Sequence, residues 1–508
     1  MSTPATVSAL LANGAAEAPA IGAPGQPPLS FHALRALTER TGTALNAAGI
    51  GRGDRVAIVL ANGPEAASSF LAVACHAVTA PLNPTYKAEE FAFYLSDLRA
   101  KALIVAQGAE TPARAVAAEQ GIPVIELIPD ATAAGAFTLS PPPGLSGTPA
   151  SGGPAGADDT ALVLHTSGTT ARPKIVPLSH ANLAASARHI GRTLSLTPDD
   201  VCLNIMPLFH IHGLIAAVLS SVAAGGSVCC TPGLNGFRFF TWLREVRPTW
   251  YTAVPTMHQA LLDLAPRFND VIKTGRLRFI RSSSASLPPP VMAAMEAAFG
   301  VPVVESYGMT EATHQMASNP LPPGARYAGS VGLAAGPDVA IMDAHGTLLP
   351  ANTVGEVVIR GPNVTAGYEN NPAANASAFH DGWFRTGDEG VLDAAGYLRL
   401  TGRLKEIINR GGEKIAPIEV DNILMEHEAV QQVVTFAMPS RTFGEDVAAA
   451  VVLADGAAAD AEALRAFVAG RLAPFKVPRT IVFLKEIPKG ATGKLQRIGL
   501  AERLGVKD

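Results

Sequence analysis

The pattern of hydrophobic positions alternates between helix-like and strand-like segments over the first part of the chain. Residues 31–48 form a helix-like run, whereas the short apolar runs "RVAIVL" at 55–60 and "ALIVA" at 102–106 indicate buried strands. Residues 51–54 supply a turn between helix and strand. This alternation predicts α/β units with mostly parallel strands and with helices on both faces of the sheet.

The same alternation resumes after a connection of low complexity. Residues 140–159 are rich in Gly, Pro and Ser, which predicts a flexible link ahead of the strand "TALVLHT" at 160–166. A helix beginning near His180 follows, with strands near "VCLNIM", "SVCCT", "TWYTAV", "RFIRSS" and "PVVESYG". A second α/β unit is therefore expected.

The last third of the chain changes pattern twice. Residues 328–400 are rich in strands, and the turns "DAHG" and "DAAG" suit hairpins, which predicts a β-rich subdomain. After "TGRLKEIINRGG" a helix, two strands, a helix and a strand predict a compact α+β unit. We thus expect an α/β fold with a large N-terminal domain (1–402) of two α/β subdomains plus a β-rich subdomain, and a small, mobile α+β C-terminal domain (403–508).

Composition narrows the class of protein. A net charge of -4, a pI of about 6.3 and interspersed acidic and basic residues argue against nucleic-acid binding and against a polybasic membrane surface. Four cysteines without CxxC spacing fit a reducing compartment. The most apolar stretch, 213–230, contains glycines and serines and fits a buried helix and strand better than a membrane span. We expect a soluble, cytoplasmic enzyme of small metabolites, monomeric or homodimeric.

The strand at 160–166 ends in a loop that is rich in hydroxyl groups. Hydroxyl and backbone N–H donors, a glycine that allows close approach and a nearby lysine together favour a phosphate-binding loop. A Ser/Thr-rich surface turn is the alternative, and the order of residues differs from the GxxxxGK[ST] of ordinary P-loop NTPases. The candidate phosphate-binding residues are Thr166, Ser167, Gly168, Thr169, Thr170 and Lys174.

Further motifs accompany this loop along the chain. "LHTSGTTARPK", "MPLFHIHG", "ESYGMTE", "FRTGDEG", "LTGRLKEIINRGGEKIAP" and "PKGATGKLQR" follow one another over residues 164–497. In that order they resemble the signature blocks of the adenylate-forming superfamily of acyl-CoA synthetases, adenylation domains and luciferases. The resemblance is strongest to oxalate–CoA ligases, with malonyl-CoA synthetases and 4-coumarate–CoA ligases as neighbours. It implies joining of a carboxylate to the α-phosphate of ATP with Mg²⁺, and then transfer of the acyl group to CoA.

The resemblance also implies roles for individual residues. The loop around Lys174 would grip the β- and γ-phosphates, and Lys494 would enter between the carboxylate and the α-phosphate. Lys405 would be the hinge of the C-terminal domain. The remaining implied roles are adenine binding by Tyr307 and Gly308, α-phosphate binding by Thr310, Mg²⁺ binding by Glu311, ribose binding by Asp388 with Arg403 as a basic partner, and lining of the CoA channel by Gly411 and Gly412.

The acyl site is the least determined part of the sequence. His210 matches a gate beside the acyl group, with a structural histidine as the alternative, and His212 stays unassigned. Ser284, Ser286 and His314 suggest a short acid with a second carboxylate, although serines in a turn would explain "SSSASL" as well. Oxalate is the first choice and malonate stays open, because the basic partner of a dianion could be Arg238 or Arg281. Loading of a carrier-protein thiol is a further possibility. A catalytically inactive AMP-binding or regulatory protein would be expected to lack Lys494, Glu311 or Asp388, and all three are present.

Overall fold

The first α/β unit is a seven-stranded sheet in the order β7-β6-β5-β3-β4-β8-β9. The computed structural model describes residues 5–166, 173–489 and 495–507. Strands β7 and β9 are antiparallel to their neighbours and the others run parallel. The elements are α2 (Phe31–Ala47), β3 (Arg55–Val59), α3 (Pro64–Ala74), β4 (Val78–Pro81), α4 (Ala88–Leu98), β5 (Ala102–Ala106), α5 (Pro112–Glu119), β6 (Val124–Pro129), β7 (Phe137–Ser140), β8 (Thr160–Thr166) and β9 (Lys174–Ser179).

The second unit is a nine-stranded sheet in the order β16-β15-β14-β13-β12-β10-β11-β1-β2. Its far edge comes from the N-terminal strands β1 (Pro19–Ala23) and β2 (Gln26–Ser30), which the hydrophobic pattern did not predict. The other elements are α6 (His180–Thr193), β10 (Val201–Asn204), a π-helix (His212–Leu219), α7 (Ser220–Ala223), β11 (Ser227–Cys230), α8 (Gly236–Val246), β12 (Trp250–Ala253), α9 (Pro255–Leu264), β13 (Phe279–Ser282), α11 (Pro289–Phe299), β14 (Val303–Met309), β15 (His314–Ser318) and β16 (Leu333–Ala334).

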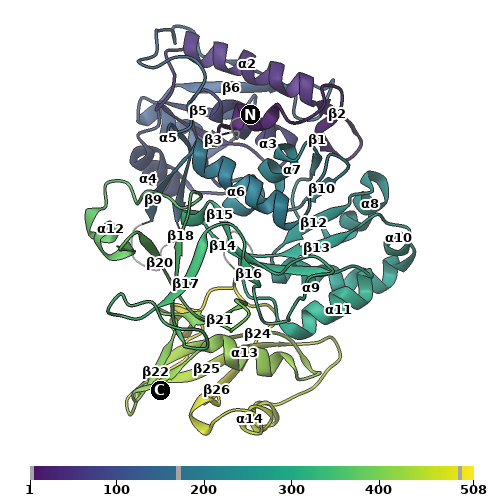
Figure 1. Cartoon of the computed structure of the whole chain (residues 1–508), viewed down its shortest axis with the longest axis vertical. Helices are drawn as coiled ribbons and strands as arrows, with labels where there is room; N and C mark the ends of the chain where they lie inside the picture. The colour runs from purple at the N-terminus through teal and green to yellow at the C-terminus, as the bar shows by residue number, and fades with distance from the viewer. Residues whose placement is uncertain (1–4, 167–172, 490–494, 508) are drawn as a thin grey trace.

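Helix α6 holds these two sheets together. It contacts β8 and β9 of the first sheet and β15 of the second, and it lies between them in Figure 1. Its N-cap Ser179 accepts a hydrogen bond from the backbone N–H of Asn182, whose side chain in turn accepts one from Ser179 N–H. The strand that precedes the hydroxyl-rich loop and the strands of the second sheet are thereby fixed relative to each other.

Two smaller sheets complete the chain. The β-rich subdomain contains β17 (Asp338–Met342), β18 (Gly355–Arg360), α12 (Pro372–Ala378), β19 (Phe379–His380), β20 (Trp383–Leu392) and β21 (Leu398–Arg403), all paired antiparallel. The C-terminal unit contains β22 (Ile408–Arg410), β23 (Glu413–Ile415), α13 (Pro417–Met425), β24 (Val430–Ser440), β25 (Gly444–Leu453), α14 (Ala461–Ala469), β26 (Thr480–Phe483) and α15 (Leu500–Arg503). The predicted α/β class with a small α+β C-terminal unit is confirmed.

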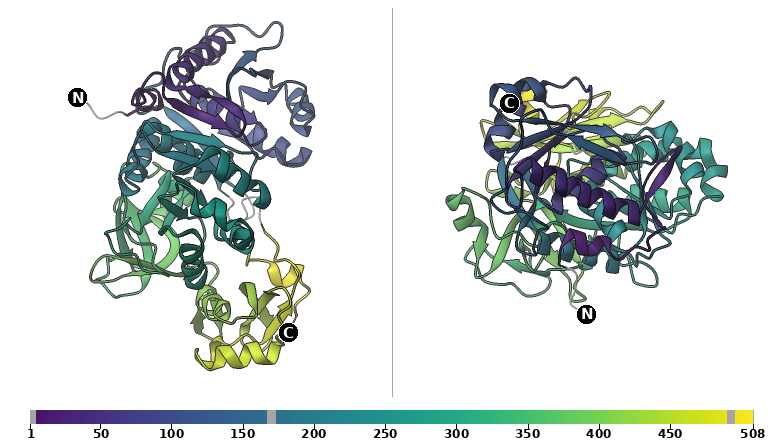
Figure 2. Two further views of the ribbon diagram at one scale, coloured as in Figure 1. Left: turned by 90° about the vertical axis from the view of Figure 1, so that its right-hand side faces the viewer. Right: turned by 90° about the horizontal axis from the view of Figure 1, so that it is seen from above.

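The C-terminal unit lies at one end of the molecule, beyond α9 and α11 (Figures 1 and 2). The side chain of Gln431 donates to Asp263 Oδ2 at 3.0 Å, and its carbonyl accepts from Gln259 Nε2 at 3.4 Å. The turn between β21 and β22, which contains Lys405, joins this unit to the large domain. Across the described ranges, every helix is too short or too polar to cross a bilayer.

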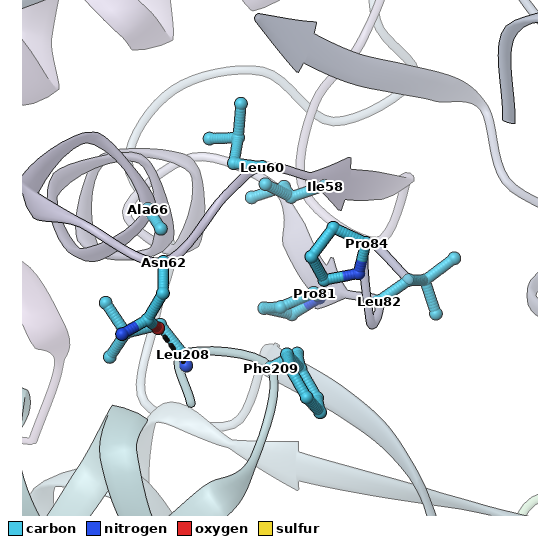
Figure 3. A pocket seen from close by; sticks show the side chains of 9 residues that line it. All are labelled: Ile58, Leu60, Asn62, Ala66, Pro81, Leu82, Pro84, Leu208 and Phe209. Atoms are coloured by element: carbon cyan, nitrogen blue, oxygen red, sulfur yellow. Dashed lines mark hydrogen bonds between the residues drawn. The ribbon is translucent and has the colours of Figure 1, made fainter. Parts of the chain in front are cut away.

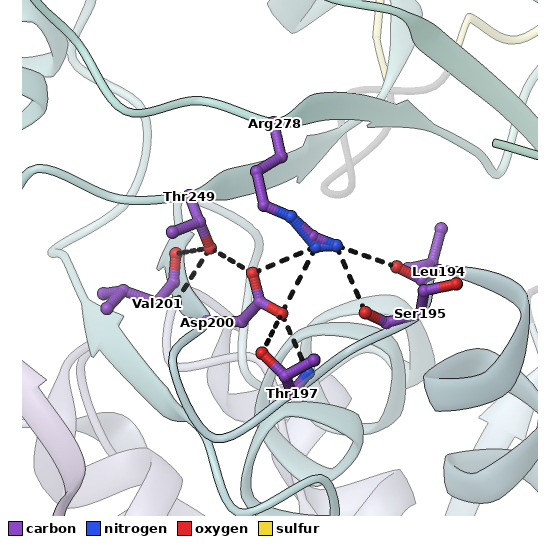
Figure 4. Close-up of polar contacts among 7 residues, drawn as sticks. All are labelled: Leu194, Ser195, Thr197, Asp200, Val201, Thr249 and Arg278. Carbon is purple, nitrogen blue, oxygen red and sulfur yellow. Dashed lines mark hydrogen bonds and ion pairs between the residues drawn. The ribbon is translucent and has the colours of Figure 1, made fainter. Parts of the chain in front are cut away.

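A buried carboxylate secures the base of the second sheet. Asp200 accepts hydrogen bonds from Thr249 Oγ1 at 2.6 Å and from the backbone N–H of Thr197 at 2.8 Å, and it pairs with Arg278 at 3.3 Å (Figure 4). Arg278 also donates to the carbonyls of Leu194 and Ser195, just beyond α6. These bonds join the end of α6 to the amino ends of β10, β12 and β13, at the edge opposite to the candidate site.

We predict that Asp200→Ala lowers the free energy of unfolding of the large domain by about 2–4 kcal/mol, because it leaves buried donors without an acceptor. Arg278→Ala should cost about 1 kcal/mol or less, since this side chain is 36% exposed and its ion pair is screened. Urea unfolding followed by tryptophan fluorescence, with Trp250 buried on β12, measures both. Equal losses in the two variants would contradict this account.

Candidate active site

The site is organised by the antiparallel pair β14 and β15, which a 3-10 turn (Thr310–Ala312) connects. Gly308 faces Gln315 and Met309 faces His314. A Cβ atom on Gly308 would lie 1.9 Å from the carbonyl oxygen of His314, so only glycine allows this approach. The "YGMTE" motif and His314 are therefore held side by side.

One group of predicted nucleotide-binding residues lies at the start of this pair. The hydroxyl of Tyr307 donates to one carboxylate oxygen of Asp388 on β20, and Arg403 Nε donates to the other at 2.8 Å. Tyr307 and Asp388 are buried, and the carboxylate raises the pKa of Arg403 further above its ordinary value. The structure thus joins three motifs that are far apart in the sequence.

A second group contains a residue that the sequence motifs did not indicate, Tyr368. Its hydroxyl donates to Glu311 Oε1 at 2.8 Å, and Lys174 Nζ lies 4.2 Å from the centre of its ring. Burial raises the pKa of Glu311. Lys174 is paired with Thr166 across β8 and β9, at the base of the hydroxyl-rich loop. A buried carboxylate with a lysine nearby suits a site where phosphates and a hard cation such as Mg²⁺ bind together.

A third cluster, which we call the acyl cluster because it contains the predicted acyl-site residues Ser284 and His314, centres on Arg281 of β13, which is completely buried. Its Nη1 donates to His212 Nε2 and to Thr252 Oγ1, each at 3.4 Å, and its Nη2 donates to Gln315 Oε1 at 3.4 Å. The same Nη2 is 3.5 Å from His314 Nδ1. All of these contacts are long and none of them is to a carboxylate, and among the described residues Arg281 Nε has no hydrogen-bond partner. Burial lowers the pKa of Arg281 to about 9.

His212 and Ser284 complete this cluster. His212 Nε2 is 2.6 Å from Thr252 Oγ1, and its Nδ1 is 3.0 Å from Ser284 Oγ. The imidazole of His212 thus bridges Thr252 and Ser284, and the direction of each bond is set by which ring nitrogen carries the proton. Ser284 and His314 have φ values of +74° and +92°, so their backbones are strained at this point.

His210 lies next to this cluster rather than in its centre. Its Nδ1 accepts a hydrogen bond from the backbone N–H of His212 at 3.3 Å, and His212 begins the π-helix. The preceding loop is fixed by Asn62, whose Oδ1 accepts from Leu208 N–H at 2.8 Å. A small apolar cavity of about 40 Å³ lies between this loop and β3 and β4 (Figure 3). His212, which the sequence left unassigned, thus contacts Arg281, as His314 does.

The structure separates the remaining candidates from these clusters or does not describe them. Ser286 is half-buried further along the Ser284 loop, and Arg238 is exposed on α8. Lys405 is exposed in the inter-domain turn. Gly411 and Gly412 are exposed in the β22–β23 hairpin with positive φ values, beside Phe443. Ser167, Gly168, Thr169, Thr170 and Lys494 lie outside the described residues.

Two family models match the chain. The model of the AMP-binding enzymes matches residues 11–369, and the model of the AMP-binding enzyme C-terminal domain matches residues 419–494. Tyr307, Glu311 and Tyr368 fall within the first match, whereas Asp388 and Arg403 lie between the two matches.

Similar proteins and structures cover nearly the whole chain. An oxalate–CoA ligase of Arabidopsis thaliana is 45% identical and spans 97% of both chains. An oxalate–CoA ligase of Saccharomyces cerevisiae is 42% identical and spans 89% of this chain and 87% of its own. The ATP-bound crystal structure of MatB from Rhodopseudomonas palustris is 32% identical, with a TM-score of 0.88 over 99% of both chains.

We predict that Tyr368→Phe weakens binding of ATP in the presence of Mg²⁺ by about fivefold, because Glu311 loses one hydrogen bond of about 1 kcal/mol. Tyr368→Leu, which also removes the ring beneath Lys174, should weaken it further. Calorimetric titration with and without Mg²⁺ measures both effects. Tyr397→Phe is the control, since that hydroxyl donates to a backbone carbonyl elsewhere. Affinities unchanged relative to the control would refute the role of Tyr368.

Proposed function

The chain belongs to the AMP-binding enzyme family, and we propose that it is an oxalate–CoA ligase that forms oxalyl-CoA from oxalate, ATP and CoA. It is an acid–thiol ligase that uses ATP, Mg²⁺ and CoA. The two relatives named for oxalate support the choice of acid. Diphosphate leaves when the acid is adenylated, and AMP leaves when CoA takes the acyl group.

The burial of Arg281 is the observation that supports the proposed substrate. A buried cation that contacts no carboxylate among the described residues is expensive, because its lost hydration is not replaced by an opposite charge. A bound carboxylate would supply that charge and would also accept from the Ser284 hydroxyl. A monocarboxylic acid would have to leave its only carboxylate there, away from the nucleotide. The cluster therefore favours an acid with two carboxylates.

The spacing of the cluster favours a short acid. His314 contacts Arg281 and faces Met309, the residue before Thr310, which is the proposed α-phosphate contact. In oxalate the two carboxylates are directly bonded, so one can lie at Arg281 while the other points to Thr310. Malonate is the alternative, since it differs by a single methylene group. His210 and Ser286 would line this space rather than hold the second carboxylate.

The nucleotide side would act through positioning and charge. Tyr307 and Gly308 would hold adenine, Asp388 oriented by Arg403 would hold the ribose, and Lys174 with the loop from Thr166 to Thr170 would hold the β- and γ-phosphates. Glu311 would be a ligand of Mg²⁺, which neutralises phosphate charge when bound. Lys494 would stabilise the charge that builds up between the carboxylate and the α-phosphate.

The C-terminal unit would serve both half-reactions. In the structure the hairpin that carries Gly411 and Gly412 is exposed and packs on Phe443. A rotation at Lys405 would bring this hairpin to the active site in place of the Lys494 loop, where it would line the path of CoA.

We predict that the purified protein with ATP, Mg²⁺ and CoA forms oxalyl-CoA in preference to the thioesters of malonate, acetate and 4-coumarate. Mass spectrometry of the products, with diphosphate release followed in parallel, makes this measurement. A dominant malonyl-CoA or 4-coumaroyl-CoA product would refute the assignment of oxalate. Diphosphate release without a CoA thioester would instead indicate another acceptor, such as a carrier-protein thiol.

We further predict that Arg281→Met lowers kcat/KM for oxalate by about 100-fold or more, because the second carboxylate loses its buried charge partner. Binding of ATP should stay within about twofold. The variant should unfold at the same urea concentration or a higher one, since it removes a buried charge that pairs with no carboxylate within residues 5–166, 173–489 and 495–507. Arg238→Met on the exposed face of α8 is the matched control. Unchanged use of oxalate by Arg281→Met would disprove the role of the guanidinium.

A further inference from the structure

A hollow of about 420 Å³ opens on the surface of the second sheet, between the end of α6 and the loop after β16. It is lined by His189, Arg192, Thr193, Ala335 and Gly336. None of these residues belongs to the motifs of the nucleotide site or to the Arg281 cluster. We call this hollow the outer vestibule.

The vestibule has the character of an anion site. Arg192 is exposed at its rim, in the last turn of α6. His189 is 8% exposed, and among the described residues its Nδ1 atom is buried without a hydrogen-bond partner. Burial and the nearby charges of Arg192 and Arg188 lower the pKa of His189 to about 4, so its ring is neutral and can donate. Gly336 leaves room for this ring, since a Cβ atom there would lie 2.2 Å from Nδ1.

The side chain of Gln315 links the wall of the vestibule to the acyl cluster. Gln315 is completely buried, and its Nε2 donates to Thr193 Oγ1 and to the carbonyl of Ala335, each at 3.0 Å. Its Oε1 accepts from Arg281 Nη2 at 3.4 Å. Gln315 therefore contacts the wall of the vestibule with one end of its amide and the buried guanidinium with the other.

We propose that the outer vestibule binds the anionic acid substrate, a small dicarboxylate, and delivers it past Gln315 to Arg281 by a route that is separate from the nucleotide side. This proposal rests on the proposed function. A separate route allows the acid to enter when ATP already fills the other side of the site. It also gives a role to the neutral amide of Gln315, which can exchange its hydrogen bonds for those of a carboxylate.

Electrostatics gives the proposal a measurable signature. A basic rim raises the local concentration of an anion, and the effect falls steeply as salt screens it. A dicarboxylate should respond more strongly to salt than a monocarboxylate, because the interaction scales with the charge of the acid. The route affects arrival of the acid, so it should appear in KM for the acid and not in KM for ATP.

The first test compares Arg192→Glu with Arg40→Glu, which reverses another exposed charge on a helix, on α2 at the opposite end of the large domain (Figure 1). At low salt Arg192→Glu should raise KM for oxalate by about tenfold, and the difference should shrink to about twofold or less at 0.5 M salt. KM for ATP and kcat at saturating oxalate should match the control. Equal KM values for oxalate in the two variants would overturn the proposal.

The second test blocks the vestibule with a covalent label and measures binding as well as activity. The four native cysteines are buried, so Ala335→Cys introduces a thiol that a maleimide can label selectively. Labelling should raise KM for oxalate strongly, and saturating oxalate should slow the labelling. Ala118→Cys on the exposed face of α5 is the control. Normal use of oxalate after complete labelling, or no protection by oxalate, would refute the route.

These outcomes are distinct from a failure of the proposed function. If the unmodified enzyme makes no oxalyl-CoA but accepts another short dicarboxylate, the assignment of oxalate fails and both tests are run with that acid. If the enzyme uses oxalate while Arg192→Glu and the labelled Ala335→Cys variant behave as their controls do, only the proposed role of the vestibule is refuted. If the enzyme uses no dicarboxylate, both fail.

Discussion

The close approach of Gly308 to the carbonyl of His314 is the constraint on which the site depends. It lets β14 and β15 pair directly across the turn that carries Thr310 and Glu311. One strand then presents Tyr307 toward Asp388, and the other presents His314 and Gln315 toward Arg281. A reaction that joins two anions requires both to be held in a fixed geometry before reaction. A backbone ladder provides this more rigidly than side chains on separate loops could.

The acyl cluster shows a balance between stability and function. Arg281 is buried and contacts no carboxylate in the part of the chain that the structure describes, and Ser284 and His314 have backbones in a region that is unfavourable for residues other than glycine. Each feature raises the free energy of the folded state. The fold tolerates these unfavourable features for two reasons. Thr252, His212 and Gln315 accept hydrogen bonds from the guanidinium, and Asp200 secures the amino ends of the strands at the opposite edge of the sheet. A dicarboxylate would then bind to a preformed site and would neutralise the charge of Arg281.

The sequence predicted the elements whose information is local. The helix at 31–48 and the strands at 55–60 and 102–106 are within one residue of α2, β3 and β5. The N-terminal strands β1 and β2 were missed, since β1 pairs with the distant strand β11 and β2 pairs with β1. Motifs indicated Tyr307, Asp388 and Arg403. His212 was named without a role and Tyr368 gave no signal, because their partners Arg281 and Glu311 come from distant segments. The choice between Arg238 and Arg281 needed burial, which composition does not reveal. The link at 140–159 was expected to be flexible, yet its backbone hydrogen-bonds to Arg52 and Cys75.

The distribution of ion pairs around Lys405 bears on how the two domains move. Arg403, before this residue, pairs with Asp388 of the large domain. Glu406, after it, pairs with Arg497, which also pairs with Asp421 of the C-terminal unit. The charged contacts therefore divide on either side of Lys405, so a rotation there would break neither set. Arg497 lies three residues beyond Lys494, and its bonds would carry that segment with the C-terminal unit. The contacts of Gln431 with α9 involve a neutral amide, so they oppose such a rotation only weakly.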